Sequence, residues 1–312
     1  MALRERDIPR FFAQSVGKNV EQSIPLSTHS YFRIGGNADY FFTASSSSDL
    51  LKAVHFAIDR SLPYYVIGGG TNLLFDDRGF RGLIIKNSTR GIKRKEEEHI
   101  EVLSGTALEE LIHFCSEEDL SGLEFLAGIP GSVGGAVYGN AGAFNREIGS
   151  SLKEAVLLRR EGDRITVSRD YFSFGYRYSA LRRTHEILLK ATFALRKGNR
   201  EEIKARIEKF REKREKRHPP MNVACAGSYF KNPIIPDGKK VPAAQLLDNI
   251  GAKDLKIGGA EVFSGHANFI INAGSATAKD VLELADALKK RVKKKFNVEL
   301  EEEVIYLPAE PS

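Results

Sequence analysis

The segment from residue 128 to residue 142 constrains the fold most strongly, because it holds six glycines in fifteen residues. They are Gly128, Gly131, Gly134, Gly135, Gly139 and Gly142. Glycine lets the backbone approach another surface closely and adopt positive φ angles. A disordered loop is the alternative, but Ile129, Val133 and Val137 recur through the segment and are typical of packed structure. The pattern therefore predicts backbone packed against something large and flat.

Two further glycine clusters occur earlier in the chain. Gly35-Gly36 follows Arg33-Ile34, and Gly68-Gly69-Gly70-Thr71-Asn72 directly follows the strand-like run 64–67. Successive backbone N–H groups in such loops can point at a phosphate. The second cluster is neither a dinucleotide-binding fingerprint, since no helix-period segment follows it, nor a P-loop, since Gly-Lys-Ser/Thr is missing. Three separate clusters predict an extended diphosphate cofactor held by the backbone of two subdomains.

Composition limits the class of protein. The chain has 312 residues, 42% hydrophobic and 28% charged, which predicts two or three domains with real cores. The net charge is +6, but the clearest basic run, Lys204–Arg217, is interleaved with glutamates. Ile203, Ile207 and Phe210 fall at helical spacing there, which favours a solvated amphipathic helix. A basic nucleic-acid-binding protein is the alternative from another class, and it would concentrate its charge in one stripe.

Other features favour a soluble, cytoplasmic protein. Cys115 and Cys225 are the two cysteines, which excludes a disulfide framework and fits a reducing compartment. The N-terminus lacks the apolar core of a signal peptide, and no stretch is apolar enough to span a membrane. The histidines are scattered without metal-ligand spacing, so no metal site is expected. We expect a small-molecule substrate and no nucleic-acid or membrane partner; the oligomeric state stays open, with a monomer as the expectation.

The alternation of strand-like and helix-like segments predicts an α+β fold with mixed sheets. Strands are expected at 64–67, 83–85, 100–103, 155–158, 165–167 and 187–189, around Ser228, and near 259–262, 269–271 and 304–307. Helices are expected at 200–217, 243–249 and 278–295. Thr106 and Glu109 have the spacing of a capping box at the start of a further helix.

Six motifs, in this order and spacing, resemble the UDP-N-acetylenolpyruvoylglucosamine reductase (MurB) family over about residues 21 to 307. They are 32–36, 68–74, 128–135, 176–179, 227–233 and 300–304. The short passage 174–179, with no long tyrosine-bearing insertion after it, resembles the type II branch of that family.

The resemblance implies a vanillyl-alcohol-oxidase/PCMH-type FAD-binding fold. An N-terminal arm (1–20) would precede FAD-binding subdomains at 21–86 and 87–197 and a C-terminal α+β substrate-binding domain at 198–312. It also implies non-covalent FAD, NADPH as co-substrate, and reduction of UDP-N-acetylglucosamine enolpyruvate to UDP-N-acetylmuramate in peptidoglycan precursor synthesis. A different flavin oxidoreductase on this fold would share the glycine clusters but not the catalytic residues.

Three residues match the catalytic positions of the family. Arg177 would hold the substrate carboxylate, since a guanidinium can make two parallel hydrogen bonds and stay charged. Ser228 would be the proton donor, assisted by Lys231 or an ordered water. Glu303 would be the catalytic glutamate; Glu301 is the rival, because alternate residues of a strand share a face.

The remaining contacts that the resemblance implies fall into two sets. The FAD contacts are Arg33, Gly35, Gly36, Gly68, Gly69, Gly70, Thr71, Asn72, Gly128, Ile129, Pro130, Gly131, Ser132, Gly134 and Gly135. The substrate contacts are Arg217, Asn232 and His266. Phe144 stands where the family often has tyrosine, which removes one possible hydroxyl contact.

Overall fold

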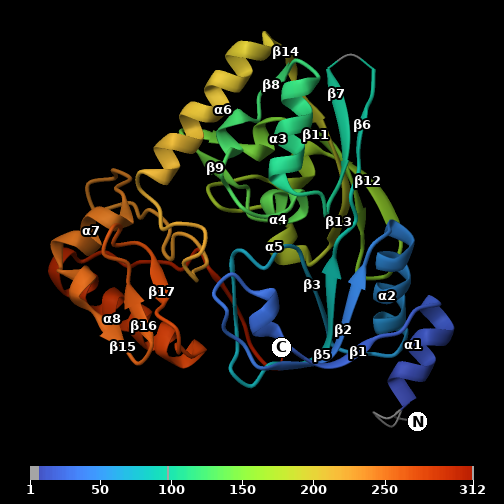
Figure 1. Cartoon of the computed structure of the whole chain (residues 1–312), viewed down its shortest axis with the longest axis horizontal. Coiled ribbons are helices and arrows are strands. Elements are labelled where there is room, and N and C mark those ends of the chain that lie inside the picture. Colours follow the sequence, from blue (N-terminus) through green and yellow to red (C-terminus); the bar gives the residue numbers. More distant parts are fainter. Residues whose placement is uncertain (1–6, 97, 311–312) are drawn as a thin grey trace. The chain divides into compact units, whose positions relative to one another are not determined.

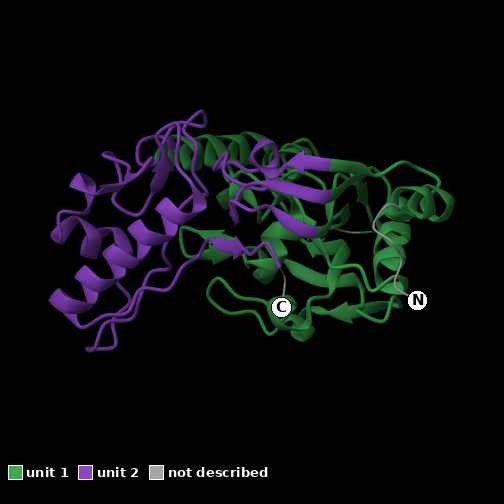
Figure 2. Cartoon of the chain, turned by 90° about the horizontal axis from the view of Figure 1, so that it is seen from below, with its two compact units in different colours: residues 1–22, 40–69, 82–214 green, residues 23–39, 70–81, 215–312 purple. Residues whose placement is uncertain are grey.

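A computed structural model describes residues 7–96 and 98–310 of the chain. The chain divides into two compact units, shown in Figure 2. Unit 1 comprises 1–22, 40–69 and 82–214, and unit 2 comprises 23–39, 70–81 and 215–312. Each unit thus gathers three separate stretches of sequence. The expected division into an arm and three domains at residues 20, 86 and 197 stays a prediction.

The first sheet has the strand order β1-β2-β5-β3. Its strands are β1 (Glu21–Pro25), β2 (Asn37–Ala44), β3 (Tyr64–Ile67) and β5 (Phe80–Asn87). β3 lies wholly in unit 1, whereas β1, β2 and β5 each have residues of both units. Helices α1 (Ile8–Val16) and α2 (Ser47–Asp59) belong to unit 1. β3 pairs parallel with β5, with Tyr64 opposite Leu83. The expected N-terminal arm therefore contains a helix, because Phe12 of α1 is buried edge-on against Phe42 and Phe56.

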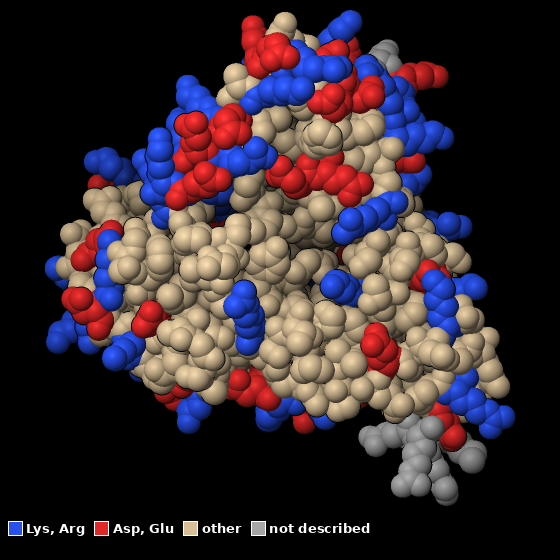
Figure 3. Space-filling model, viewed as in Figure 1, with Lys and Arg blue, Asp and Glu red and all other residues tan. Residues whose placement is uncertain are grey.

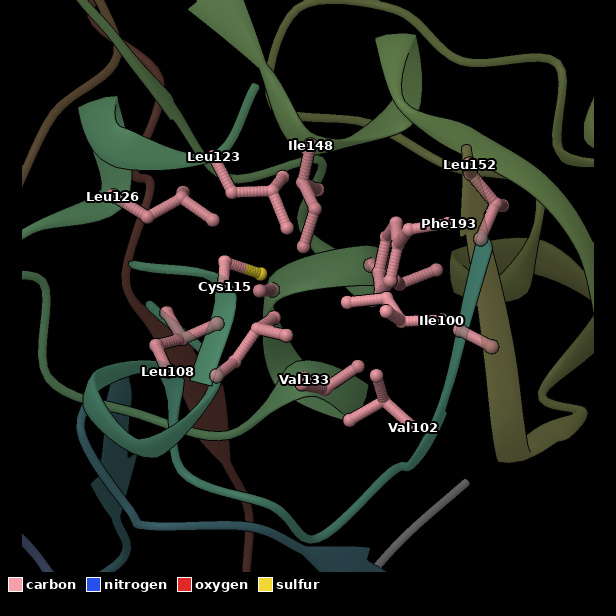
Figure 4. Packing of buried hydrophobic residues seen from close by; sticks show 14 of the residues in the cluster. Ile100, Val102, Leu108, Cys115, Leu123, Leu126, Val133, Ile148, Leu152 and Phe193 are labelled. Carbon is pink, nitrogen blue, oxygen red and sulfur yellow. The ribbon is translucent and has the colours of Figure 1, made fainter. Parts of the chain in front are cut away.

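The second sheet of unit 1 has the order β12-β11-β13-β7-β6 and is antiparallel (Figure 1). Its strands are β6 (Ile92–Arg94), β7 (His99–Leu103), β11 (Leu152–Leu158), β12 (Arg164–Ser168) and β13 (Ile187–Ala194). Burial alternates along β7, so Ile100 and Val102 enter the core. Figure 4 shows both pointing toward Leu108 and Val133, which lie on helices α3 and α4.

The remaining elements of unit 1 cover this core. The helices are α3 (Leu108–Glu117), α4 (Val133–Tyr138), α5 (Leu181–Thr184) and α6 (Arg200–Glu215). The short strands are β8 (Leu120–Ser121), β9 (Gly142–Ala143), β10 (Arg146–Glu147) and β14 (Arg196–Lys197). Turns of 3-10 helix lie at Glu124–Leu126, Ile148–Ser150 and Arg169–Phe172. α6 buries Ile203 and Ile207 in the core cluster, which confirms the expected amphipathic helix.

The capping box expected at Thr106 is wrong. α3 begins at Leu108 without a side-chain cap, and the Thr106 hydroxyl instead bonds to the N–H of Gly91 at 3.2 Å. The Leu108 N–H donates to the carbonyl oxygen of Gly131 at 3.0 Å. The helix start is therefore satisfied by the glycine-rich segment rather than by its own side chain.

Unit 2 contains a three-stranded sheet and a parallel strand pair. The sheet order is β15-β16-β17, from β15 (Lys256–Ile257), β16 (Ala260–Val262) and β17 (Ile270–Asn272), and the helices are α7 (Ala243–Asn249) and α8 (Ala278–Phe296), with 3-10 turns at Leu26–His29 and Ala252–Asp254. α8 buries Val281, Leu284 and Leu288 at helical spacing, and it lies against β15 and β16 (Figure 1). The second pair joins β18 (Ile305–Leu307) to β4 (Leu73–Phe75).

Across residues 7–96 and 98–310, no helix combines the length and apolar character that crossing a bilayer requires.

A buried carboxylate lies at the end of the β4–β18 pair. Asp76 accepts hydrogen bonds from the Arg78 guanidinium, at 2.9 and 3.1 Å, and from the Tyr306 hydroxyl at 2.6 Å. The Arg78 contact is the main reason that the pKa of Asp76 is well below its usual range. Burial, and then the bond to Asp76, raises the pKa of Tyr306 to about 12. This cluster therefore joins β18 to the segment after β4 at neutral pH.

Replacing Tyr306 by Phe should lower the free energy of unfolding by about 1–3 kcal/mol, because a buried carboxylate loses one of its donors. Tyr31→Phe is the matched control, since Tyr31 is 39% exposed and Tyr306 is 38% exposed. Equilibrium denaturation at pH 7 measures both variants. Equal stabilities of the two variants would show that the Tyr306 hydroxyl contributes nothing to the fold.

Candidate active site

The glycine-rich segment of unit 1 shows which glycines the fold itself requires. Gly128 and Gly131 have φ angles of 72° and 137°, which other residues rarely adopt. A Cβ atom on Gly134 would lie 3.0 Å from the Ser104 carbonyl oxygen. Gly135 is different, because a Cβ there would meet nothing nearer than the Ser132 hydroxyl at 3.7 Å. Packing within the chain therefore does not explain the glycine at 135, where a Cβ atom would fit.

Arg214, at the C-terminal end of α6, has a buried nitrogen atom that could donate a hydrogen bond to a ligand. Its Nε donates to the Ala127 carbonyl oxygen at 3.1 Å, while its Nη2 is buried without a hydrogen-bond partner among the described residues. Burial, followed by the nearby Arg177 charge, lowers the pKa of Arg214 to about 10. Buried donors are nearly always satisfied in proteins. A guanidinium beside Gly128 with a spare buried donor therefore fits an acceptor group of a bound cofactor.

Sequence reasoning missed Arg214, although a signal was present. Ile203, Ile207, Phe210 and Arg214 follow one another at intervals of four, three and four, so the arginine falls on the apolar face of the helix. A cation at such a position is a candidate for ligand binding.

Arg177 is held in a tight turn of unit 1. Gly175 and Tyr178 exchange two backbone hydrogen bonds of 3.1 Å, and Arg177 between them has a φ angle of 56°. Its Nη2 donates to the Gly142 carbonyl oxygen at 2.8 Å, and its guanidinium lies 5.2 Å from the centre of the Tyr176 ring. A left-handed non-glycine residue is strained, and such strain is concentrated at functional sites. The turn thus fixes a half-buried cation in one orientation.

Ser228 and Glu303 lie on neighbouring segments of unit 2. An isolated antiparallel bridge joins Phe230 to Glu302, and the Glu303 N–H donates to the Tyr229 carbonyl oxygen at 2.7 Å. The strand expected around Ser228 is therefore reduced to single bridges. Ser228 is half-buried, and its hydroxyl makes no hydrogen bond to any of the residues described. Arg177 belongs to unit 1.

The two rival glutamates have different surroundings. Glu301 has a side chain that is 75% exposed and forms a 2.9 Å ion pair with Lys231. The backbone carbonyl oxygen of Glu303 accepts a hydrogen bond from the Asn72 side chain at 3.1 Å. The backbone of Glu303 is therefore tied to the end of the second glycine cluster. Lys231 is engaged by Glu301.

The expected substrate contacts have several structural roles in unit 2. The Asn232 Oδ1 accepts a hydrogen bond from the Ala243 N–H, at the first residue of α7, at 3.0 Å. The His266 Nδ1 accepts the Asn268 N–H at 3.2 Å, and its ring packs 5.0 Å from Phe269. Burial is the main cause of the lowered pKa of His266, and the exposed Arg217 also contributes. A neutral His266 therefore supports this turn.

The other expected contacts show similar internal roles. In unit 2, Arg33 has a φ angle of 55° and donates to the Asn222 carbonyl oxygen at 3.3 Å. A Cβ atom on Gly35 would lie 2.7 Å from the Cβ of Phe75, so packing alone requires that glycine. Phe144 in unit 1 is 42% exposed, and its ring lies 4.5 Å from that of Phe210.

Comparison with known proteins identifies the family. The model "UDP-N-acetylenolpyruvoylglucosamine reductase, C-terminal domain" matches residues 219–307, and "FAD binding domain" matches 38–168. A UDP-N-acetylenolpyruvoylglucosamine reductase of Clostridium botulinum is 38% identical over 91% of this chain and 92% of its own length. One of Clostridium novyi is 37% identical over 92% of both chains. This chain belongs to the UDP-N-acetylenolpyruvoylglucosamine reductase family.

A solved structure extends this result to the fold. The UDP-N-acetylenolpyruvylglucosamine reductase (MurB) of Thermus caldophilus has a TM-score of 0.78 and 32% identity, covering 93% of this chain and 99% of its own. The expected α+β fold of the FAD-binding type is confirmed, as is the enzyme class, an FAD-dependent oxidoreductase. No cluster of metal-binding side chains occurs among the described residues.

Gly135→Ala should weaken FAD binding at least about tenfold while leaving the fold intact, because alanine favours the helix by roughly 1 kcal/mol. Gly139→Ala is the matched control at the other end of α4, where a Cβ would lie 3.6 Å from the nearest atom. Thermal unfolding of the apoprotein and fluorescence titration with FAD measure the two effects. Equal FAD affinity in both variants would place the cofactor away from Gly135.

Proposed function

We propose that this protein catalyses the NADPH-dependent reduction of UDP-N-acetylglucosamine enolpyruvate to UDP-N-acetylmuramate, in the synthesis of peptidoglycan precursors in the cytoplasm. The observation that carries the proposal is the extent of the similarity to reductases of this name, 38% identity over 91% of the chain. The pairing of the Ser228 and Glu303 segments within unit 2 supports it.

FAD would be held without a covalent bond by the backbone of the three glycine clusters. In unit 1 the groups that fit are the glycines from Gly128 to Gly135 and the spare donor of Arg214. In unit 2 they are the Arg33–Gly36 turn and residues 70–72 of the second glycine cluster. When bound, FAD supplies the hydride chemistry, taking a hydride from NADPH and passing it to the enol ether.

Arg177 would hold the carboxylate of the enolpyruvyl group. Addition of hydride to the terminal carbon of the double bond builds negative charge next to that carboxylate. A fixed cation stabilises this charge without having to reorganise, which is usually the largest catalytic contribution. The strained turn at Arg177 and its bond to the Gly142 carbonyl oxygen provide that fixed orientation.

Ser228 would deliver the proton to carbon two, next to the carboxylate. Its hydroxyl is half-buried and has no partner among the described residues, so it is available to a substrate. A serine hydroxyl is a weak acid, and the reaction therefore needs a second group near it. Glu303, on the adjoining segment, would provide that group, because Lys231 is paired with Glu301.

The alternative of a nucleic-acid-binding protein lacks a basic stripe on the face that Figure 3 shows. Lysines and arginines there are mixed with acidic residues, notably over α6. Arg211 on that helix pairs with Glu208 at 3.1 Å and with Glu109 at 2.5 Å. A nucleic-acid backbone would have to compete with these ion pairs.

Ser228→Ala should leave anaerobic reduction of the flavin by NADPH unchanged and slow its reoxidation by the enolpyruvyl UDP-sugar by about 100- to 10,000-fold. Stopped-flow absorbance separates the two half-reactions, and Ser264→Ala, an exposed serine of the same unit, is the control. Wild-type protein that the sugar does not reoxidise would overturn the proposed reaction. Normal reoxidation of Ser228→Ala would overturn only the role of the serine.

Glu303→Gln should slow the same reoxidation step by at least about 100-fold, because the amide is not an acid. Glu301→Gln should stay within about twofold of wild type, since it loses only an exposed ion pair with Lys231. Single-turnover rates of the two variants decide between the two positions, and a reversed order would show that Glu301 is the functional glutamate.

A further inference from the structure

The segments that contain Ser228 and Glu303 pair as antiparallel strands, but one of their pairs of hydrogen bonds is only half formed. A hydrogen-bonded antiparallel pair exchanges two N–H···O bonds. Of the two possible between Tyr229 and Glu303, only the one from the Glu303 N–H is formed. The Tyr229 N–H instead donates to the carbonyl oxygen of Asn268 at 2.8 Å, and the Glu303 carbonyl oxygen accepts from Asn72. Asn268 thus takes the place of the missing acceptor for Tyr229, and Asn72 takes the place of the missing donor for Glu303.

The Asn268 carboxamide completes this replacement. Its Oδ1 accepts the Phe230 N–H at 3.0 Å, and its Nδ2 donates to the Phe230 carbonyl oxygen at 2.8 Å. The side chain therefore acts like the peptide group of a neighbouring strand. Asn268 is 4% exposed, so these bonds are shielded from water. If they were lost, water could not replace them as partners of the Phe230 N–H and carbonyl groups.

The Asn268 contacts hold Ser228 from one side only. Gly227, which precedes the serine, has a φ angle of 81° and open space where a side chain would lie. Tyr229 and Phe230, which follow it, carry all three of the Asn268 contacts. Asn268 and the Glu303 N–H thus both hold the residues that directly follow Ser228. Asn268 is itself held by the bond from its N–H to the His266 Nδ1.

We propose that Asn268 is a positioning residue that aims the Ser228 hydroxyl at the substrate. The inference rests on the proposed function, in which Ser228 supplies the proton. Asparagine is specific to this role: aspartate keeps the acceptor for the Phe230 N–H but sets an oxygen against the Phe230 carbonyl, and leucine provides neither group. Glutamine keeps both groups on a side chain that is one methylene longer.

The test compares Asn268→Gln and Asn268→Asp with Asn272→Asp in the FAD-loaded enzyme. Asn272 is the matched control, because its side chain, like that of Asn268, bonds backbone groups of unit 2, namely those of Phe32, Gly274 and Ala276. Flavin reduction by NADPH should be unchanged in all variants. Reoxidation by the enolpyruvyl UDP-sugar should slow at least about tenfold in the Asn268 variants, with little change in substrate affinity.

The solvent isotope effect separates positioning from a loss of stability. In deuterium oxide the Asn268 variants should show a larger isotope effect on reoxidation than wild type, because a misdirected hydroxyl makes proton transfer limiting. Asn272→Asp should lose thermal stability without that increase. If Asn268→Asp does not fold, Asn268→Gln carries the test, and a wild-type rate and isotope effect in Asn268→Gln would overturn the proposal.

A double-mutant cycle distinguishes this proposal from the function on which it rests. In a Ser228→Ala background, Asn268→Gln should cause no further slowing of reoxidation, because the group that it positions is gone. Full additivity of the two effects would show that Asn268 does not act through Ser228. Failure of wild-type protein to be reoxidised, or normal reoxidation of Ser228→Ala alone, would instead refute the proposed reaction or its proton donor.

Discussion

Unit 2 depends on the parallel pairing of β18 with β4. These strands lie more than two hundred residues apart in sequence, yet Ile305 is opposite Leu73 and Leu307 is opposite Phe75. The pairing continues backwards through Asn72, whose carbonyl oxygen accepts the Ile305 N–H at 3.1 Å. At its other end the Asp76 cluster joins the same two segments. This pairing sets Glu303 beside the second glycine cluster, and hence beside a predicted cofactor loop.

Closing such a long loop costs conformational entropy, which grows slowly with loop length. The cost is offset by contacts at the junction, such as the short bond between the Tyr306 hydroxyl and the buried Asp76 carboxylate. The candidate site of unit 2 therefore lies where the chain end returns to an earlier segment. The position of Glu303 depends on the pairing of β18 with β4. Substitutions at Tyr306 that weaken this pairing are therefore expected to shift the backbone at Glu303.

Much of the fold was predictable from local pattern. The strands at β3, β5, β7, β11, β12 and β13 and the helices α6, α7 and α8 occur where periodicity predicted them. Predictions from local sequence pattern failed where a residue far away in the chain supplied the hydrogen-bond partner of a backbone group. Thr106 does not cap α3, because Gly131 supplies the acceptor, and the segment of Ser228 is not a regular strand, because Asn268 replaces its partner. Arg214 was missed because charge was read as a sign of solvent exposure.

The sequence by itself determined the glycine clusters, the amphipathic helices and the order of motifs that resembles the family, since these depend on residues close together in the chain. Only the tertiary structure decided that Glu301 pairs with Lys231 while Glu303 is tied to Asn72, and that Asn268 holds the segment of Ser228. Hydrogen bonds act over about 3 Å, whatever the separation in sequence. Partners from distant segments therefore become visible only when the chain has folded.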